Sequence, residues 1–167
     1  MKNIAIIGAG ISGLYIANLL SQNSNYQVTI YEKNGSVNLE KGYGIQLSVN
    51  SIKLLNQINF QKIRVEDKFH PHKLDFYSLK NNKKICDLDI SMFNSADRKY
   101  TTLQRSTLIN FLKDGLHGNI IHYNKKIIKI NEEAENKEVS FEDGSSVKYD
   151  YLIISDGTFS KTKSLIA

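Results

Sequence analysis

Residues 1–20, MKNIAIIGAGISGLYIANLL, decide the fold. Residues 3–7 form a short apolar run rich in β-branched side chains, which predicts a buried strand. The glycines of residues 8–13 predict a turn, and residues 12–21 have the apolar spacing of a helix. A second β-rich run follows at residues 27–31. The order strand, glycine turn, helix, strand is a βαβ unit, whose crossover should be right-handed.

Four apolar runs predict one buried parallel sheet, at residues 4–7, 28–31, 120–123 and 152–154. Other segments predict helices at residues 48–58 and 105–116, a hairpin of strands 74–79 and 84–88, and three further strands at 126–130, 138–141 and 146–148. Asp143-Gly144 is a tight-turn signal between the last two strands. We therefore expect an α/β fold: a parallel sheet, an antiparallel three-strand meander and an inserted hairpin.

Composition excludes several classes of protein. The 167 residues are 41% hydrophobic and 23% charged, as in ordinary globular domains, and no apolar run reaches the ~18 residues of a membrane helix. The net charge of +5 is dispersed, so no nucleic-acid partner is expected. Cys86 is the only cysteine, which excludes a disulfide framework within the chain. We expect it to be a small core residue. We expect a cytoplasmic protein, with peripheral membrane association as a second option.

Gly8, Gly10 and Gly13 form the pattern G-x-G-x-x-G, and Glu32 follows nineteen positions after the last of them. This pattern between a strand and a helix, with an acid at the end of the next strand, is typical of dinucleotide binding. The first glycine permits the turn, the second lets the pyrophosphate approach, and the third lets helix and strand pack closely. Glu32 would accept hydrogen bonds from ribose and repel a 2′-phosphate. NADP is disfavoured, whereas NAD and FAD both stay open.

Four segments occur in one order and spacing: the N-terminal βαβ unit, GYGIQLSVNSIKLLNQI (42–58), TTLQRSTLINFL (101–112) and FEDGSSVKYDYLIISDGTFSKTK (141–163). This order resembles the FAD-dependent aromatic-ring monooxygenases, the group that contains para-hydroxybenzoate hydroxylase and the ubiquinone-biosynthesis hydroxylases. The resemblance covers nearly the whole chain but only the N-terminal part of such an enzyme. It implies a Rossmann-like FAD/NAD(P)-binding domain over residues 1–167, with residues 70–103 as the beginning of a substrate-facing β insertion.

The resemblance also implies the residues that bind FAD. The expected set is Gly8, Gly10, Ser12 and Gly13 at the pyrophosphate, Glu32 and Lys33 at the adenosine ribose, Arg105 near the phosphate and ribityl chain, Ile127 at the adenine, and the pair Asp156 and Gly157 with Ser160 after it. A cation at a helix N-terminus is disfavoured by the helix dipole, which favours a functional reason for Arg105. Three positions depart from the family pattern: Ile154 and Ser155 stand where G-A-D-G has glycine and alanine, and Lys163 replaces an arginine.

The implied activity is hydroxylation of a small aromatic or quinone-like substrate. NAD(P)H would reduce FAD, and O2 would add to the reduced flavin as a C4a-hydroperoxide that transfers the hydroxyl group. Since the cofactor carries this chemistry, no catalytic side chain and no metal are expected. His70 and His72 flank Pro71 without a third nearby ligand, so they are interpreted as loop residues.

Members of this family continue beyond the point that matches residue 167. The sequence is therefore expected to be a fragment or one half of a split enzyme, with strand 151–155 as an open, apolar sheet edge. Through this edge the chain would pair with a missing C-terminal half or with itself. Two alternatives stay open: an inactive nucleotide-binding remnant or interaction module, and another FAD or NAD oxidoreductase.

Overall fold

The computed structural model describes residues 1–37, 43–118, 120–133 and 136–166. The chain forms two compact units, one of Met1–Leu39 with Ile109–Ala167 and the other of Glu40–Leu108. Each unit is described by itself below. The sequence prediction of one domain with an insertion at residues 70–103 stays a prediction.

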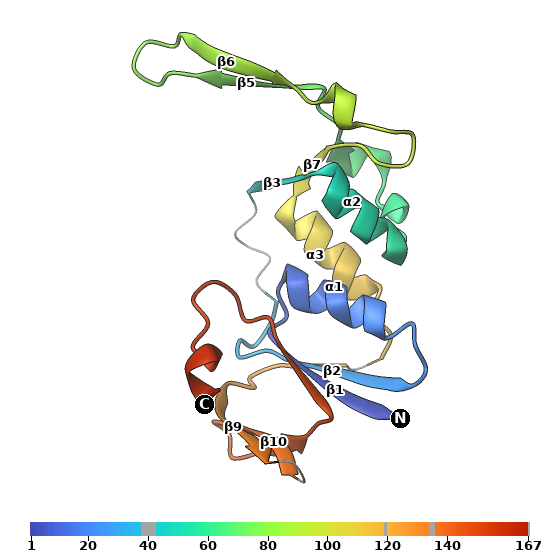
Figure 1. Ribbon diagram of the computed structural model, residues 1–167, viewed down its shortest axis with the longest axis vertical. Coiled ribbons are helices and arrows are strands. Elements are labelled where there is room, and N and C mark those ends of the chain that lie inside the picture. The colour runs from blue at the N-terminus through green and yellow to red at the C-terminus, as the bar shows by residue number, and fades with distance from the viewer. Residues whose placement is uncertain (38–42, 119, 134–135, 167) are drawn as a thin grey trace. The chain divides into compact units, whose positions relative to one another are not determined.

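A four-stranded parallel sheet is the centre of the first unit (Figure 1). Its order is β12 (Tyr151–Ile154), β1 (Lys2–Ile7), β2 (Tyr26–Tyr31) and β8 (Ile121–His122). In register, Ile4 lies beside Val28 and Ile6 beside Ile30. These β-branched side chains suit a sheet that is covered on both faces. The predicted parallel sheet is confirmed, and β12 lies at one edge of it.

Helix α1 (Ile11–Leu20) packs on one face of β1 and β2 (Figure 1). Leu14 and Ala17 of this helix are fully buried. Asn18 joins α1 to the later part of helix α3 (Arg105–Asp114), because its amide donates to Leu14 O at 2.8 Å and to Leu112 O at 2.7 Å. The side-chain amide of Asn18 therefore joins the two helices through one backbone carbonyl of each.

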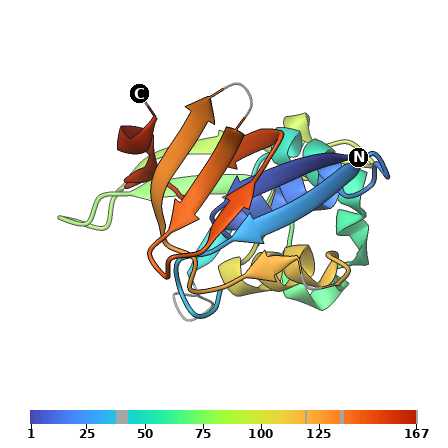
Figure 2. The same ribbon diagram turned by 90° about the horizontal axis from the view of Figure 1, so that it is seen from below.

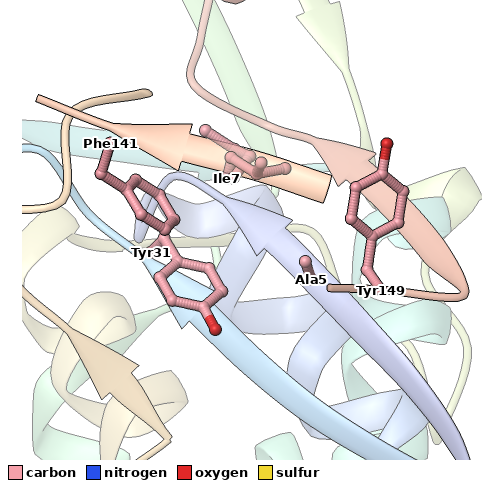
Figure 3. Close-up of a cluster of buried hydrophobic side chains, with 6 residues drawn as sticks. Ala5, Ile7, Tyr31, Phe141 and Tyr149 are labelled. Atoms are coloured by element: carbon pink, nitrogen blue, oxygen red, sulfur yellow. The ribbon is translucent and has the colours of Figure 1, made fainter. Parts of the chain in front are cut away.

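The other face of the parallel sheet is covered by an antiparallel meander of β9 (Ile127–Glu133), β10 (Asn136–Phe141) and β11 (Ser146–Lys148) (Figure 2). The predicted turn at Asp143-Gly144 is present, with Gly144 at φ +82°. Side chains of β1, β2 and β10 meet Tyr149, which follows β11, in a core cluster between the two sheets (Figure 3). The cluster consists of Ala5, Ile7, Tyr31, Val139, Phe141 and Tyr149. The predicted meander is thus confirmed and completes the core of the first unit.

The second unit contains three short antiparallel strands that the sequence patterns did not predict. Their order is β3 (Gly44–Leu47), β7 (Thr101–Gln104) and β4 (Lys68–Phe69). Helix α2 (Val49–Leu55) follows β3 and is shorter than the predicted helix, since residues 56–58 continue as a 3₁₀ turn. Within the described ranges, the 3₁₀ segments of the second unit are Asn56–Ile58, Phe60–Lys62, Val65–Asp67 and Ser91–Phe93, and Thr162–Leu165 is a 3₁₀ segment of the first unit.

The predicted hairpin is confirmed as β5 (Lys73–Tyr77) paired with β6 (Lys84–Asp89). Two lysines and two aspartates form ion pairs across it, including Lys84 to Asp75 at 2.8 Å and Lys73 to Asp87 at 3.0 Å. The prediction that Cys86 is a core residue is wrong, because its side chain is exposed. Among the described residues these two strands pair only with each other, so the hairpin has no interior of its own.

No helix within the described ranges is both long and apolar enough to cross a bilayer.

Substitution of Phe141 tests the core between the two sheets. This side chain is 1% exposed and its ring centroid lies 4.8 Å from that of Tyr31. We expect Phe141→Ala to lower the free energy of unfolding by about 3–5 kcal/mol, because it removes a buried ring and leaves a cavity. The measurement is urea unfolding of the whole chain followed by circular dichroism.

The matched control is Ile128→Ala on the neighbouring strand β9, where the side chain is 49% exposed. It should change the free energy of unfolding by no more than about 0.5 kcal/mol. Equal effects of the two substitutions would contradict this placement of the core.

Candidate functional site

The candidate site lies at the carboxyl edge of the parallel sheet, where β1, β2 and β12 all end. The glycine loop, defined as residues 8–13, follows β1. Glu32 follows β2, and Asp156 follows β12 after one intervening residue. Because parallel strands end at a common edge, three segments distant in sequence come together there.

Gly8 and Gly13 are required by the packing of the protein itself. Gly8 has φ +104°, and a Cβ atom there would lie 2.7 Å from Ser155 O. A Cβ atom on Gly13 would lie only 2.0 Å from Gly8 O. Any side chain at these two positions would therefore displace backbone, and the close approach of α1 to the loop depends on both glycines.

Gly10 differs from the other two glycines. Its backbone angles, φ −78° and ψ −177°, are open to any residue. A Cβ atom there would meet nothing within 4 Å. Neither backbone conformation nor internal packing explains a glycine at this position, so the protein leaves open space beside the loop.

The N-terminus of α1 points its amide groups toward this space. The first intrahelical bond runs from Leu14 N to Gly10 O at 2.9 Å, so the preceding amides of the first turn have no intrahelical acceptor. No side chain caps the helix, and its first turn carries no acidic residue. Ser12 is exposed in this turn. Free amides and the helix dipole together form a site suited to an anion such as a phosphate.

Glu32 is 9% exposed, and neighbouring groups hold its carboxylate in place. One oxygen accepts the amide of Ala9 at 2.8 Å, and the other accepts the backbone and side-chain amides of Asn34 at 3.0 Å and 2.7 Å. A carboxylate offers about four acceptor positions. Capacity for a further donor, such as a sugar hydroxyl, is therefore left, while Lys33 beside it is exposed.

Asp156 is the second acid at this edge. Its Oδ2 accepts the hydroxyl of Thr162 at 2.7 Å, whereas its Oδ1 is buried without a hydrogen-bond partner. Burial acts to raise the pKa of Asp156, but hydrogen bonds from Ser160 and Thr162 outweigh it and hold the pKa below its ordinary value. Gly157 follows with φ +93°, a conformation that favours glycine. The charged form is thus maintained with one acceptor atom unused.

The remaining two predicted site residues lie elsewhere in the chain. Ile127 begins β9 and packs, partly buried, against the core cluster. Arg105 begins α3 within the second unit, where its amide donates to Tyr43 O at 3.1 Å. The carboxyl edge therefore brings together eight of the ten predicted residues: Gly8, Gly10, Ser12, Gly13, Glu32, Lys33, Asp156 and Gly157.

His70 belongs to the second unit, where its Nδ1 lies 3.1 Å from Thr101 Oγ1 and 3.3 Å from Tyr100 O. Among the described residues, no group of three or more histidine, cysteine or acidic side chains is placed to hold a metal ion.

Three residues of this edge were not among the predicted site residues. Asn34 holds Glu32, Thr162 holds Asp156, and the hydroxyl of Ser155 donates to Ile7 O at 2.9 Å. The position of Asn34, two residues after the acid, is a local signal of an Asx-type contact that sequence could have provided. The other two contacts depend on how the chain folds back.

Residues 6–38 match a family model described as an NAD(P)-binding Rossmann-like domain. Over 162 residues the chain is 25% identical to 6-hydroxynicotinate 3-monooxygenase of Pseudomonas fluorescens, an alignment that covers 96% of this chain and 42% of that protein. It is also 25% identical to salicylate hydroxylase of Pseudomonas putida, over 98% of this chain and 37% of that protein. The chain is a relative of the FAD-dependent aromatic hydroxylases.

Solved structures agree with this relationship at the level of the fold. HpxO of Klebsiella pneumoniae, in complex with FAD and uric acid, matches with a TM-score of 0.78 and 23% identity over 93% of this chain and 39% of that one. The tetrameric form of 2-methyl-3-hydroxypyridine-5-carboxylic acid oxygenase matches with a TM-score of 0.79 and 19% identity, over 94% and 40%. The chain spans about two fifths of the length of the aromatic hydroxylases that it matches.

Removal of the Thr162 hydroxyl tests the electrostatics of Asp156. Thr162 is 2% exposed, and we expect Thr162→Val to raise the pKa of Asp156 toward its ordinary value. The substitution should cost about 1 kcal/mol of stability near pH 7, because it removes one hydrogen bond to a charged group. The pKa is measured by carboxyl-carbon NMR, and stability by urea unfolding across pH.

The contribution of Asp156 to the free energy of unfolding falls as the pH is lowered. Since the folded pKa of Asp156 is depressed, the stabilisation is complete above about pH 5 and is lost as the pH falls below about 4, through the folded pKa. The difference between the variant and the wild type should shrink in the same range. Thr158→Val, an exposed threonine in the same loop, is the control and should leave both readouts unchanged. A pKa of Asp156 that does not move in Thr162→Val contradicts the assignment.

Proposed function

We propose that the chain is the FAD-binding part of an NAD(P)H-dependent flavoprotein monooxygenase that hydroxylates a small aromatic or quinone-like substrate. The observation that carries the proposal is the open space at Gly10 beside the N-terminus of α1. A glycine that the fold itself does not require is explained when the protein backbone must come close to a phosphate of the ligand.

The hydrogen-bond donors and acceptors at the carboxyl edge match the polar groups of FAD. Free amides of α1 offer donors to a pyrophosphate, and the remaining acceptor capacity of Glu32 suits a ribose hydroxyl. Asp156 places a second carboxylate at this edge, kept ionised by hydrogen bonds from Ser160 and Thr162. The amides of α1 and the spare acceptor capacity of Glu32 thus correspond to polar groups of a flavin dinucleotide.

Specific roles follow for the ten proposed cofactor residues. Gly8 and Gly13 shape the glycine loop, Gly10 and Ser12 face the pyrophosphate, and Glu32 holds the adenosine ribose with Lys33 beside it. Asp156 and Gly157 hold the far part of the dinucleotide. Arg105 and Ile127 are assigned to the phosphate–ribityl chain and the adenine through family resemblance.

When bound, FAD would supply hydride acceptance from NAD(P)H and reaction with O2. The side chains at this edge bind and orient the cofactor, and Asp156 stays ionised to accept a hydrogen bond. Related proteins act, by their names, on 6-hydroxynicotinate and salicylate. A small aromatic ring is accordingly the substrate class that we propose for the complete enzyme, which we place in the cytoplasm.

Gly10→Ala tests the proposal because it separates ligand binding from folding. A methyl group at this position should leave the free energy of unfolding within about 1 kcal/mol of the wild type, since backbone angles and space both permit it. The same methyl group enters the space for the pyrophosphate, so the dissociation constant for FAD should rise at least about 10-fold. Quenching of flavin fluorescence on titration of the purified chain gives this constant.

The control variant is Lys53→Ala, an exposed residue of α2 that should bind FAD as the wild type does. Titrations with NAD and with FAD are compared for each variant. A folded wild-type chain that binds NAD but not FAD would overturn the flavin assignment. A folded chain that binds neither at about 0.1 mM would support a remnant without cofactor.

A further inference from the structure

Ser155 directly follows β12 and contacts the glycine loop in space. Its amide donates to Ile7 O at 2.8 Å, and its hydroxyl donates to the same carbonyl at 2.9 Å. The hydroxyl also lies 3.3 Å from Gly8 O. One serine thus contacts the last residue of β1 and the first residue of the loop.

The same serine borders both glycines that the fold requires. A Cβ atom on Gly13 would lie 2.8 Å from the Ser155 hydroxyl oxygen, and a Cβ atom on Gly8 would lie 2.7 Å from Ser155 O. The hydroxyl therefore sits where the loop and the first turn of α1 approach β12 most closely. Alanine at this position would keep the backbone contact with Ile7 O but remove the hydroxyl donor.

The loop is held from its other side by the segment that ends β2. Gly8 N donates to Tyr31 O at 2.9 Å, and Ala9 N donates to the Glu32 carboxylate at 2.8 Å. Ser155 supplies the matching restraint from β12. Hydrogen bonds from both sides thus reach Gly8 and Ala9, directly before the amides of the first turn of α1.

We propose that Ser155 is a positioning residue, whose hydroxyl fixes the glycine loop in the conformation that receives the dinucleotide pyrophosphate. This inference rests on the proposed function. A loop that is already ordered spends less binding free energy on immobilisation, so its amides bind an anion more tightly. Since Asp156 is the next residue, the same segment also ties the loop to the acid with the unused oxygen.

The test compares Ser155→Ala with Ser164→Ala in the full chain. Ser164 is a matched control, because its hydroxyl also donates to a backbone carbonyl, Lys161 O at 2.7 Å, but lies outside the loop. Amide hydrogen exchange without ligand is measured first, and FAD affinity by fluorescence second. We expect faster exchange at Ala9 in Ser155→Ala and a dissociation constant for FAD raised about 3- to 10-fold, the effect of one lost hydrogen bond.

Amide hydrogen exchange in β9 and β10 distinguishes a local effect on the glycine loop from general destabilisation of the fold. Equal acceleration there and at Ala9 would assign Ser155 a merely structural role and overturn the proposal. Unchanged exchange at Ala9 would also overturn it, whether or not FAD binds. If the wild type binds no FAD, the proposed function fails, and the exchange data still decide whether Ser155 restrains the loop. If FAD binds equally to both variants, the positioning role fails and the proposed function stands.

Discussion

The contact between Gly13 and the carbonyl of Gly8 is the constraint on which the rest of the first unit depends. With 2.0 Å between that carbonyl oxygen and the position of a Cβ atom, only glycine allows α1 to start so close to β1. This approach sets the angle at which α1 covers the parallel sheet. It also directs the amides of the first helical turn to the carboxyl edge, where Glu32 and Asp156 lie.

The three glycines of the loop divide into those that serve the fold and one that serves a ligand. Gly8 and Gly13 are explained by backbone conformation and packing, whereas Gly10 is explained by neither. Features that a folded protein does not need for itself are the strongest structural indication of a binding site.

Patterns of short range in the sequence predicted much of this architecture. β-branched runs predicted all four parallel strands, and Asp143-Gly144 predicted the turn of the meander, because burial on both faces and a positive φ each leave a local signature. Strands β3, β4 and β7 are short and mix polar with apolar residues, so their pairing depends on partners distant in sequence. The prediction for Cys86 is wrong because alternation in a hairpin does not reveal whether either face is covered.

The most direct test of the account is a titration of the isotope-labelled chain with ADP, followed by amide NMR shifts. ADP carries the adenosine and pyrophosphate groups that the carboxyl edge is proposed to bind, without the flavin. If the carboxyl edge binds these groups, the largest shifts will occur at Gly10, Ile11, Ser12 and Gly13, with smaller shifts near Glu32. Shifts confined to residues outside the glycine loop, or no shifts at any ADP concentration, would contradict binding of the dinucleotide at the carboxyl edge.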